Sequence, residues 1–151
     1  MARVLFICTG NYYRSRFAEA LFNHLCEERG LDHSAFSRGL ATWVILDGSE
    51  LSPDTIDALN ERSISLKLTH RAPRQLQEKD LESADRVIAL KEAEHRRMME
   101  HQFPAWADRI TYWHVHDIDV AHPEEALPEI EVRVMALLEQ IQTASEADTA
   151  Q

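Results

Sequence analysis

A cysteine and an arginine near the start of the chain have the types and the spacing that thiol-based phosphate chemistry needs. Cys8 and Arg14 flank five residues, and Ser15 follows directly. A thiol inside a ring of backbone N–H groups and beside a guanidinium lies in positive potential, which favours the nucleophilic thiolate. The planar guanidinium can hold two phosphoryl oxygens and offset the charge that builds up during transfer. The pattern predicts a phosphate pocket with Cys8 as nucleophile and Arg14 as phosphate clamp.

The residues between them suit a tight anion-binding loop. Gly10 lets the backbone approach an anion closely, and Asn11 tolerates a left-handed conformation. Ser15 has two alternative roles, as a helix N-cap or as a hydroxyl donor to the sulfur. Tyr12 either flanks a bound aryl group or packs on neighbouring loops. The predicted phosphate- and substrate-binding residues of the loop are Thr9, Gly10, Asn11, Tyr12, Tyr13 and Ser15.

This loop must join a strand to a helix. The short apolar run Val4 to Ile7 is typical of a buried parallel strand, and Phe17, Leu21 and Leu25 recur at helical spacing. A helix amino terminus then points its free N–H groups back at the loop and attracts anions. A nucleotide-binding P-loop and a dinucleotide fingerprint are excluded by their missing Gly-Lys-Ser/Thr and glycine signatures.

Strands and helices alternate along the rest of the chain. The pattern predicts further helices at 53–62, 91–101 and around 130–141, strands at 87–90 and 110–115, and short helical turns within 63–84. One domain is expected over 1–142, followed by a small, polar tail at 143–151 that is expected to be disordered. The resulting fold class is α/β, with a four-stranded parallel sheet, helices on both faces and the Cys8 loop at the carboxyl ends of the strands.

Composition and charge exclude several classes of protein. With 26 Asp and Glu against 16 Lys and Arg, the net charge of −10 argues against nucleic-acid or membrane partners. No secretion signal is visible at the start, so residence in the cytoplasm is expected. Two cysteines make no disulfide scaffold, and Cys26 is expected to be a packing or surface residue.

The eight histidines raise the question of a metal site. His114 and His116 alternate onto one side of an extended segment near Asp117, but no pair of histidines at helical spacing has a carboxylate partner. The sequence therefore predicts no metal and no cofactor.

The loop and its surroundings resemble the low-molecular-weight protein tyrosine phosphatases. The strand, the Cys-x5-Arg-Ser loop and the Ala-Glu-Ala helix of that family match Val4 to Ala20. Ser37-Arg38-Gly39 and Trp43 look like its second strand and active-site wall, and Asp85 to Leu90 looks like its third strand, so the likeness covers nearly the whole chain. The resemblance implies a flavodoxin-like domain and two-step, metal-free hydrolysis of a phosphate monoester through a cysteinyl-phosphate. The implied partners are a phosphotyrosine protein or a small phosphate monoester, with inorganic phosphate as product and competitor.

The chain departs from the family pattern at the general acid. The family has an aspartate, usually followed by proline, after its fourth strand, and no Asp-Pro pair occurs here. Asp117 falls at the expected place, where it would protonate the leaving oxygen and then activate water. Asp119 is the alternative acid.

Three other positions also differ. Tyr13 stands where the family often has a second cysteine, so no protective disulfide can form inside the loop. Arg16 replaces a frequent proline and Arg38 a frequent small residue, which would add positive charge near the entrance. Because long basic side chains are mostly exposed, Arg16 is expected to be a surface arginine.

Two other functions use the same residues. An arsenate reductase would share the thiolate loop but needs further cysteines for a disulfide relay, which Cys26 alone fits poorly. An inactive module that binds phosphate or phosphotyrosine would explain the missing Asp-Pro pair, although a pure anion binder needs no thiol.

Substitution of the two aspartates separates the candidate acids. We predict that Asp117→Ala lowers turnover of phenyl phosphate, which has a poor leaving group, by about 10²-fold or more, because the leaving oxygen then receives no proton. Asp119→Ala should have a much smaller effect in the same steady-state assay. The reverse ranking would assign the acid to Asp119.

Overall fold

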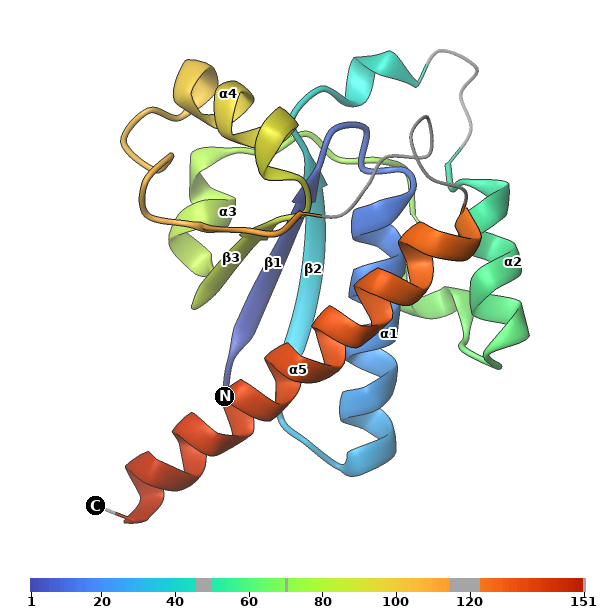
Figure 1. Ribbon diagram of the computed structural model, residues 1–151, viewed down its shortest axis with the longest axis vertical. Helices are drawn as coiled ribbons and strands as arrows, with labels where there is room; N and C mark the ends of the chain where they lie inside the picture. Colours follow the sequence, from blue (N-terminus) through green and yellow to red (C-terminus); the bar gives the residue numbers. More distant parts are fainter. Residues whose placement is uncertain (46–49, 70, 115–122, 151) are drawn as a thin grey trace.

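Four parallel strands form the sheet of the computed structural model, which describes residues 1–45, 50–69, 71–114 and 123–150. The spatial order is β2-β1-β3-β4, as Figure 1 shows. The strands are β1 (Arg3–Cys8), β2 (Ser34–Gly39), β3 (Arg86–Ala89) and β4 (Thr111–Tyr112). The predicted four-stranded parallel sheet is therefore confirmed.

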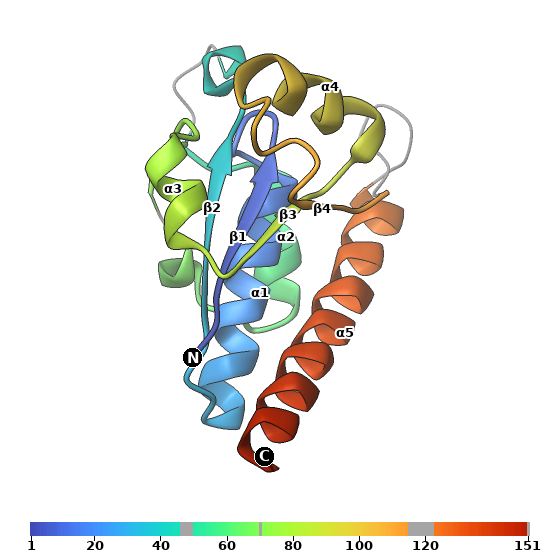
Figure 2. The same cartoon turned by 90° about the vertical axis from the view of Figure 1, so that its left-hand side faces the viewer.

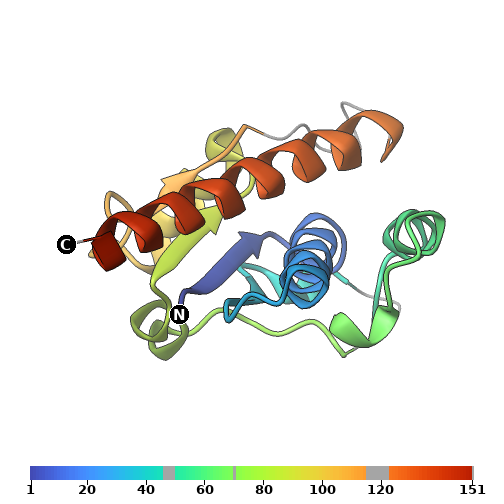
Figure 3. The same cartoon turned by 90° about the horizontal axis from the view of Figure 1, so that it is seen from below.

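Helices cover both faces of this sheet (Figures 2 and 3). The α-helices are α1 (Arg14–Arg29), α2 (Pro53–Glu61), α3 (Glu78–Ser83), α4 (Glu92–Gln102) and α5 (Pro123–Ala150). Two short 3₁₀ helices, η1 (Thr42–Val44) and η2 (Leu66–Leu68), lie in the connections. Each helix that the sequence pattern predicted is present; the bounds of α2 and α4 differ from the prediction by one residue, whereas α5 is longer than predicted at both ends.

Side chains alternate along β1, and this gives the sheet two separate hydrophobic cores. Val4 and Phe6 pack in a core shared with α1, α2 and α5. Leu5 and Ile7 pack on the other face with residues of α3 and α4. All four side chains have no exposed surface, and burial of this kind contributes about 1.5–3 kcal/mol per large apolar side chain. The two cores fix β1, and with it the position of Cys8 at its carboxyl end.

The C-terminal helix extends further than the composition indicated. α5 continues to Ala150, through a segment that the sequence predicted to be a disordered tail. Three of the eight residues in 143–150 are alanines, which have the highest helix propensity, so this segment can prolong the preceding helix. Neither α5 nor another helix among the described residues is long and apolar enough to cross a membrane.

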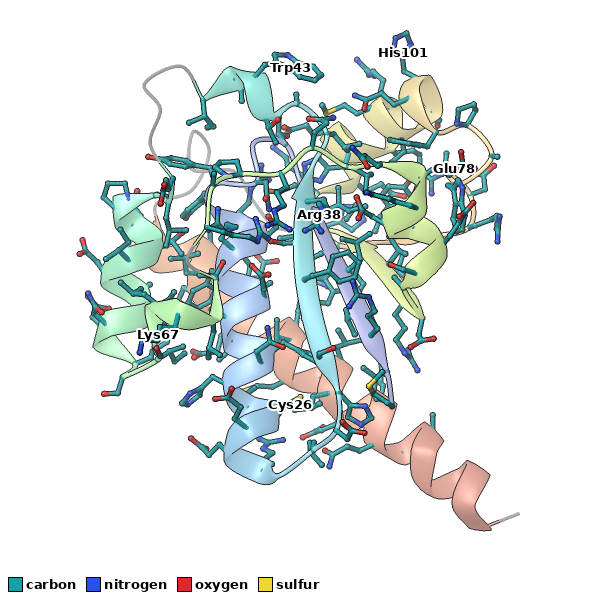
Figure 4. The ribbon with its side chains drawn as sticks, turned by 180° about the vertical axis from the view of Figure 1, so that it is seen from behind. Cys26, Arg38, Trp43, Lys67, Glu78 and His101 are labelled. Carbon is teal, nitrogen blue, oxygen red and sulfur yellow. The ribbon has the colours of Figure 1, made fainter. Side chains whose placement is uncertain are left out.

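Cys26 is a packing residue. Its side chain is buried among the residues of the α1 core, near the end of α1 that lies away from the Cys8 loop (Figure 4). Burial raises the pKa of the Cys26 thiol to about 11. The thiol is therefore protonated at neutral pH and lies at the wrong end of the helix to react with Cys8.

Candidate active site

The loop from Cys8 to Arg14 turns its backbone carbonyls outward. Leu40 N donates to Cys8 O at 3.0 Å and Ala41 N to Thr9 O at 2.8 Å, both from the segment after β2. Further donors bind the carbonyls of three more loop residues: Asn11 (from Arg16 Nη1), Tyr12 (from Ser52 N) and Tyr13 (from Thr55 Oγ1 and Phe17 N). A loop held by its carbonyls from outside directs its N–H groups to the inside, where they can bind an anion.

Gly39 allows β2 to lie against this loop. A Cβ atom at Gly39 would lie 2.8 Å from Thr9 O and 2.9 Å from Asn11 N. These distances are too short for any side chain to fit at this position. The glycine at the end of β2 is therefore needed for close approach of the backbones. Larger residues here would push the outer support away from the loop.

Asn11 fixes the shape of the loop. Its φ of 53° is left-handed, as the sequence predicted, and the residue is fully buried. Its Nδ2 donates to Ser15 Oγ at 3.1 Å and to Ser37 Oγ at 2.9 Å, and its Oδ1 accepts from Arg71 Nη1 and Arg74 N, both at 2.9 Å. The side-chain amide thus uses both donors and both acceptor positions. The strain of a left-handed non-glycine residue is offset by these four bonds.

The Ser15 hydroxyl is hydrogen-bonded to the Cys8 sulfur. The two atoms are 2.8 Å apart, in a buried contact. Ser15 Oγ also accepts from Asn11 Nδ2, which leaves the hydroxyl proton free to point at the sulfur. The alternative role of Ser15 as a helix N-cap is wrong, since Tyr13 occupies the N-cap position and no side chain caps the helix.

Two residues at the start of α4 contact the site without having been predicted. Glu94 lies 3.9 Å from Arg14 Nη2 and also accepts the hydroxyl proton of Thr9. The fully buried His95 lies with Nε2 3.1 Å from Thr9 Oγ1, while its Nδ1 accepts from Lys91 N at 3.0 Å. These bonds assign the proton of a neutral His95 to Nε2. α4 therefore orients Thr9 and places a carboxylate beside Arg14.

The prediction for Arg16 was wrong. Its side chain has no exposed surface and lies beneath the loop rather than on the surface. Five backbone and hydroxyl oxygens accept hydrogen bonds from the guanidinium, which offsets the cost of its burial. Sequence alone gave no signal for this, because the acceptors come from segments up to 55 residues away.

Arg38 does not add charge at the entrance either. It projects from β2 toward α3, where its Nε lies 3.3 Å from Asp80 Oδ2 and its guanidinium stacks on Phe36 (Figure 4). Burial lowers the pKa of Arg38, and Asp80 opposes that shift. The charge is neutralised on the face of the sheet opposite α1.

The aromatic residues of the predicted site differ in exposure. Tyr13 is buried in the α1 core and Tyr12 is partly buried against it, which agrees with packing of Tyr12 on its neighbours. Trp43 is 65 % exposed on η1 and points outward in Figure 4. Ile45, which directly follows η1, would lie 3.0 Å from a Cβ atom at Gly10, so η1 stands next to the loop.

The candidate acids lie outside the described residues. Asp117, Asp119 and His116 all fall in 115–122. His114, the last described residue before that segment, pairs with Lys91 across an isolated bridge and lies 3.2 Å from Glu92 Oε1. Over the described ranges no three His, Cys, Asp or Glu side chains gather in a way that could hold a metal ion.

A cavity of about 550 Å³ lies against β3, β4 and α5, apart from the Cys8 loop. Its walls come from α3, the start of β3 and α5, and include Trp106 and Trp113. It contains no residue of the Cys8 loop. The site is therefore identified by its chemistry and not by the size of a cavity.

Comparisons with known proteins agree with this geometry. A family model described as low molecular weight phosphotyrosine protein phosphatase matches residues 3–147. A protein-arginine-phosphatase of Bacillus subtilis (strain 168) is 33% identical over 107 residues, which cover 71% of this chain and 67% of that protein. The low molecular weight protein-tyrosine-phosphatase YfkJ of the same strain is 37% identical over 92 residues, which cover 60% of this chain and 56% of YfkJ, little more than half of its length.

The solved structures are similar over nearly the whole chain. The crystal structure of YfkJ from Bacillus subtilis has a TM-score of 0.83 at 28% identity and covers 95% of this chain and 96% of that one. The predicted flavodoxin-like α/β fold is confirmed.

Removal of the Ser15 hydroxyl tests its bond to the sulfur. We expect Ser15→Ala to slow alkylation of Cys8 by iodoacetamide at neutral pH about tenfold or more, since a hydrogen bond to a charged group contributes roughly 1.5–3 kcal/mol. Peptide mass spectrometry would follow the modified cysteine. Ser83→Ala, which removes a hydroxyl bound only to Asp80 O, is the control. Equal alkylation rates in all three proteins would contradict the assignment.

Proposed function

Because the chain belongs to the low molecular weight phosphotyrosine protein phosphatase family, a family of hydrolases, we propose that it hydrolyses phosphotyrosine in proteins with Cys8 as nucleophile. The observation that carries the proposal is the 2.8 Å contact between Ser15 Oγ and Cys8 Sγ, inside a loop whose carbonyls are bound from outside. This arrangement places the proposed nucleophile beside a hydroxyl that can donate to its sulfur, at a loop whose backbone can bind an anion. Arg14 stands at the start of α1 with its side chain almost buried.

In the first step the Cys8 thiolate attacks phosphorus. The S–P bond forms as the bond from phosphorus to the tyrosine oxygen breaks, and Asp117 gives its proton to that oxygen. Arg14 and the loop N–H groups bind the equatorial oxygens, on which charge is spread during transfer. The products of this step are free tyrosine side chain and a cysteinyl-phosphate.

In the second step water attacks the cysteinyl-phosphate. Asp117, now ionised, takes a proton from the water as its oxygen bonds to phosphorus and the S–P bond breaks. The Ser15 hydroxyl stabilises the departing thiolate. Inorganic phosphate leaves, and the starting protonation states are restored without a metal or another cofactor.

The described residues next to Asp117 support its role. His114 pairs with Lys91 in an isolated bridge. Glu94, three residues after Lys91, lies with its carboxylate 3.9 Å from Arg14. Asp117 follows His114 by three residues, which an extended chain spans in roughly 10 Å. Asp119 is two residues further along and is the alternative acid.

Trp43 is the proposed wall for the substrate ring. Its large exposed surface stands on η1, next to the loop, where an aryl group attached to a bound phosphate would emerge. Aromatic side chains pair with such rings by offset or edge-to-face stacking. Tyr12, partly buried, contributes a second apolar surface.

The two alternative functions are less well supported. A disulfide relay for arsenate reduction would need a second thiol, but Cys26 is buried and protonated at the far end of α1. An inactive binding module would have no use for a hydrogen bond between Ser15 and the Cys8 sulfur.

Phosphoarginine is a second candidate substrate, favoured by one observation. Glu94 lies 28% exposed beside Arg14, where it could receive the cationic guanidinium of a phosphoarginine side chain. A carboxylate in this position gives no comparable interaction with the neutral ring of phosphotyrosine. The similarity to the arginine phosphatase of Bacillus subtilis agrees with this candidate.

Hydrolysis of p-nitrophenyl phosphate tests the proposed chemistry. We expect metal-independent turnover that is inhibited by inorganic phosphate and that falls by more than about 10³-fold in Cys8→Ser, because serine is not ionised at neutral pH. Release of p-nitrophenol gives the rate. No turnover by folded wild-type protein would contradict the proposal and favour the binding module.

Substitution of Glu94 distinguishes the two substrates. If phosphoarginine is the substrate, Glu94→Gln should lower kcat/KM for phosphoarginine about tenfold relative to kcat/KM for phosphotyrosine, through loss of one charge-assisted bond. Phosphate release from both compounds gives this ratio. Glu92→Gln, whose carboxylate pairs with Arg96 and His114, is the matched control. An unchanged ratio would leave phosphotyrosine as the substrate.

A further inference from the structure

Arg16 is an arginine with no exposed surface, two residues beyond the phosphate clamp. Its Nε donates to Thr69 Oγ1 at 2.7 Å, and its Nη1 to Asn11 O at 3.0 Å and Glu50 O at 2.9 Å. Its Nη2 donates to Arg71 O at 2.6 Å and to Thr69 O. The guanidinium therefore uses all three of its nitrogens on acceptors that are fixed in the fold.

These acceptors belong to three separate segments around the catalytic loop. Asn11 is the left-handed residue of the loop itself. Glu50 precedes α2, where Ser52 N binds the carbonyl of Tyr12, and Thr69 directly follows η2. One side chain thus ties the loop to the two segments that support it from outside.

A second arginine completes the arrangement from the other side of Asn11. Arg71 Nη1 donates to Asn11 Oδ1, while its Nη2 lies 3.3 Å from Glu19 Oε1 and donates to Ser37 Oγ at 2.8 Å. Arg16 therefore holds the backbone carbonyl of Asn11 and Arg71 holds its side chain. Both groups must stay in place for Asn11 to keep its bond to Ser15.

Glu19 is the carboxylate that partners both guanidiniums. It accepts the hydroxyl proton of Thr69 at 2.6 Å and lies 3.9 Å from Arg16 Nε. Burial, followed by the charge of Arg71, lowers the pKa of Arg16 to about 10, and Glu19 and Cys8 oppose that shift. Arg16 is thus still protonated at neutral pH, so two cations face one buried carboxylate beneath the loop.

We propose that Arg16 is a positioning residue for phosphate binding: it holds the Cys8 to Arg14 loop, the segment before α2 and the segment after η2 in the arrangement that keeps the loop open to an oxyanion. This inference deepens the proposed function and rests on it. Arg16 does not touch the phosphoryl group, so its effect passes through Asn11 and the loop backbone.

The role requires the shape of arginine and not only its charge. The acceptors surround a planar fork, whereas a lysine ammonium is a single point with three donors. A lysine would leave several buried carbonyls without their donors, and each such group costs about 1–3 kcal/mol. Arg16→Lys should therefore disturb the loop, and weaken oxyanion binding, as much as Arg16→Gln does.

Tungstate binding gives the test, because this oxyanion resembles phosphate and is not turned over. Isothermal titration calorimetry would compare wild type, Arg16→Lys and Arg16→Gln, with KM and kcat for p-nitrophenyl phosphate measured on the same proteins. We expect the tungstate Kd to rise about tenfold in both variants, with a parallel rise in KM. Arg62→Gln is the control, since Arg62 pairs with Glu131 and its other contacts, Ala58, Glu61 and Phe17, lie outside the loop.

If Arg16 only stabilises the fold, its variants should melt at a lower temperature but keep the tungstate Kd and the KM within twofold of wild type. That result would overturn the proposal. Rescue of Kd by Arg16→Lys would also overturn it, because charge alone would then suffice. If both variants fail to fold, Thr69→Val removes only the hydroxyl between Arg16 and Glu19 and should raise Kd several-fold. An unchanged Kd in folded Thr69→Val would then contradict the proposal.

The outcome for Arg16 is separable from the outcome for the proposed function. If the wild-type protein binds tungstate but hydrolyses no phosphate ester, the proposed phosphatase function is refuted. The tungstate Kd of the variants still tests the positioning role of Arg16. If the wild-type protein hydrolyses phosphate esters and the Arg16 variants keep the wild-type tungstate Kd, only the positioning role of Arg16 is refuted. Wild-type protein that binds no tungstate would overturn both.

Discussion

The binding of the loop carbonyls from outside is the constraint on which the site depends. Five carbonyls between Cys8 and Tyr13 accept hydrogen bonds from surrounding elements, so the N–H groups are left for an anion. Backbone amides held in this way need no reorganisation when charge develops in the transition state. Cys8, Arg14 and Ser15, to which we assign the roles of nucleophile, phosphate clamp and hydroxyl donor as a proposal, all take their positions from this backbone.

The fold supplies the outer donors at one edge of the sheet. β1 and β2 end side by side, with Cys8 opposite Gly39, so the segment after β2 runs directly past the loop. α1 begins at Arg14 and carries the side chain of Arg16 under the loop, while α4 begins beside Thr9. The two hydrophobic cores hold these elements from both faces of the sheet, which couples the stability of the domain to the geometry of the site.

Local features of the site could be predicted from the sequence. The spacing of Cys8 and Arg14, the left-handed tendency of Asn11 and the strand before the loop are properties of one short segment. The fold class and most elements follow from hydrophobic periodicity in the same way. The contacts of Arg16, Glu19, Arg71 and Glu94 join residues that are 50 to 85 positions apart in several cases, and no periodicity marks them. Exposure of Arg16 was mispredicted because four of its five acceptors are backbone oxygens, which are the same at every position and leave no signal in a sequence.

The covalent intermediate provides the most direct test of the whole account. The protein would be mixed with p-nitrophenyl phosphate, quenched within milliseconds in alkaline denaturant, and digested for peptide mass spectrometry. The account predicts a phosphoryl group on the sulfur of the peptide that contains Cys8, and none on the same peptide of Cys8→Ala. A phosphoryl group on another side chain, such as His95, or turnover with no covalent intermediate, would contradict it.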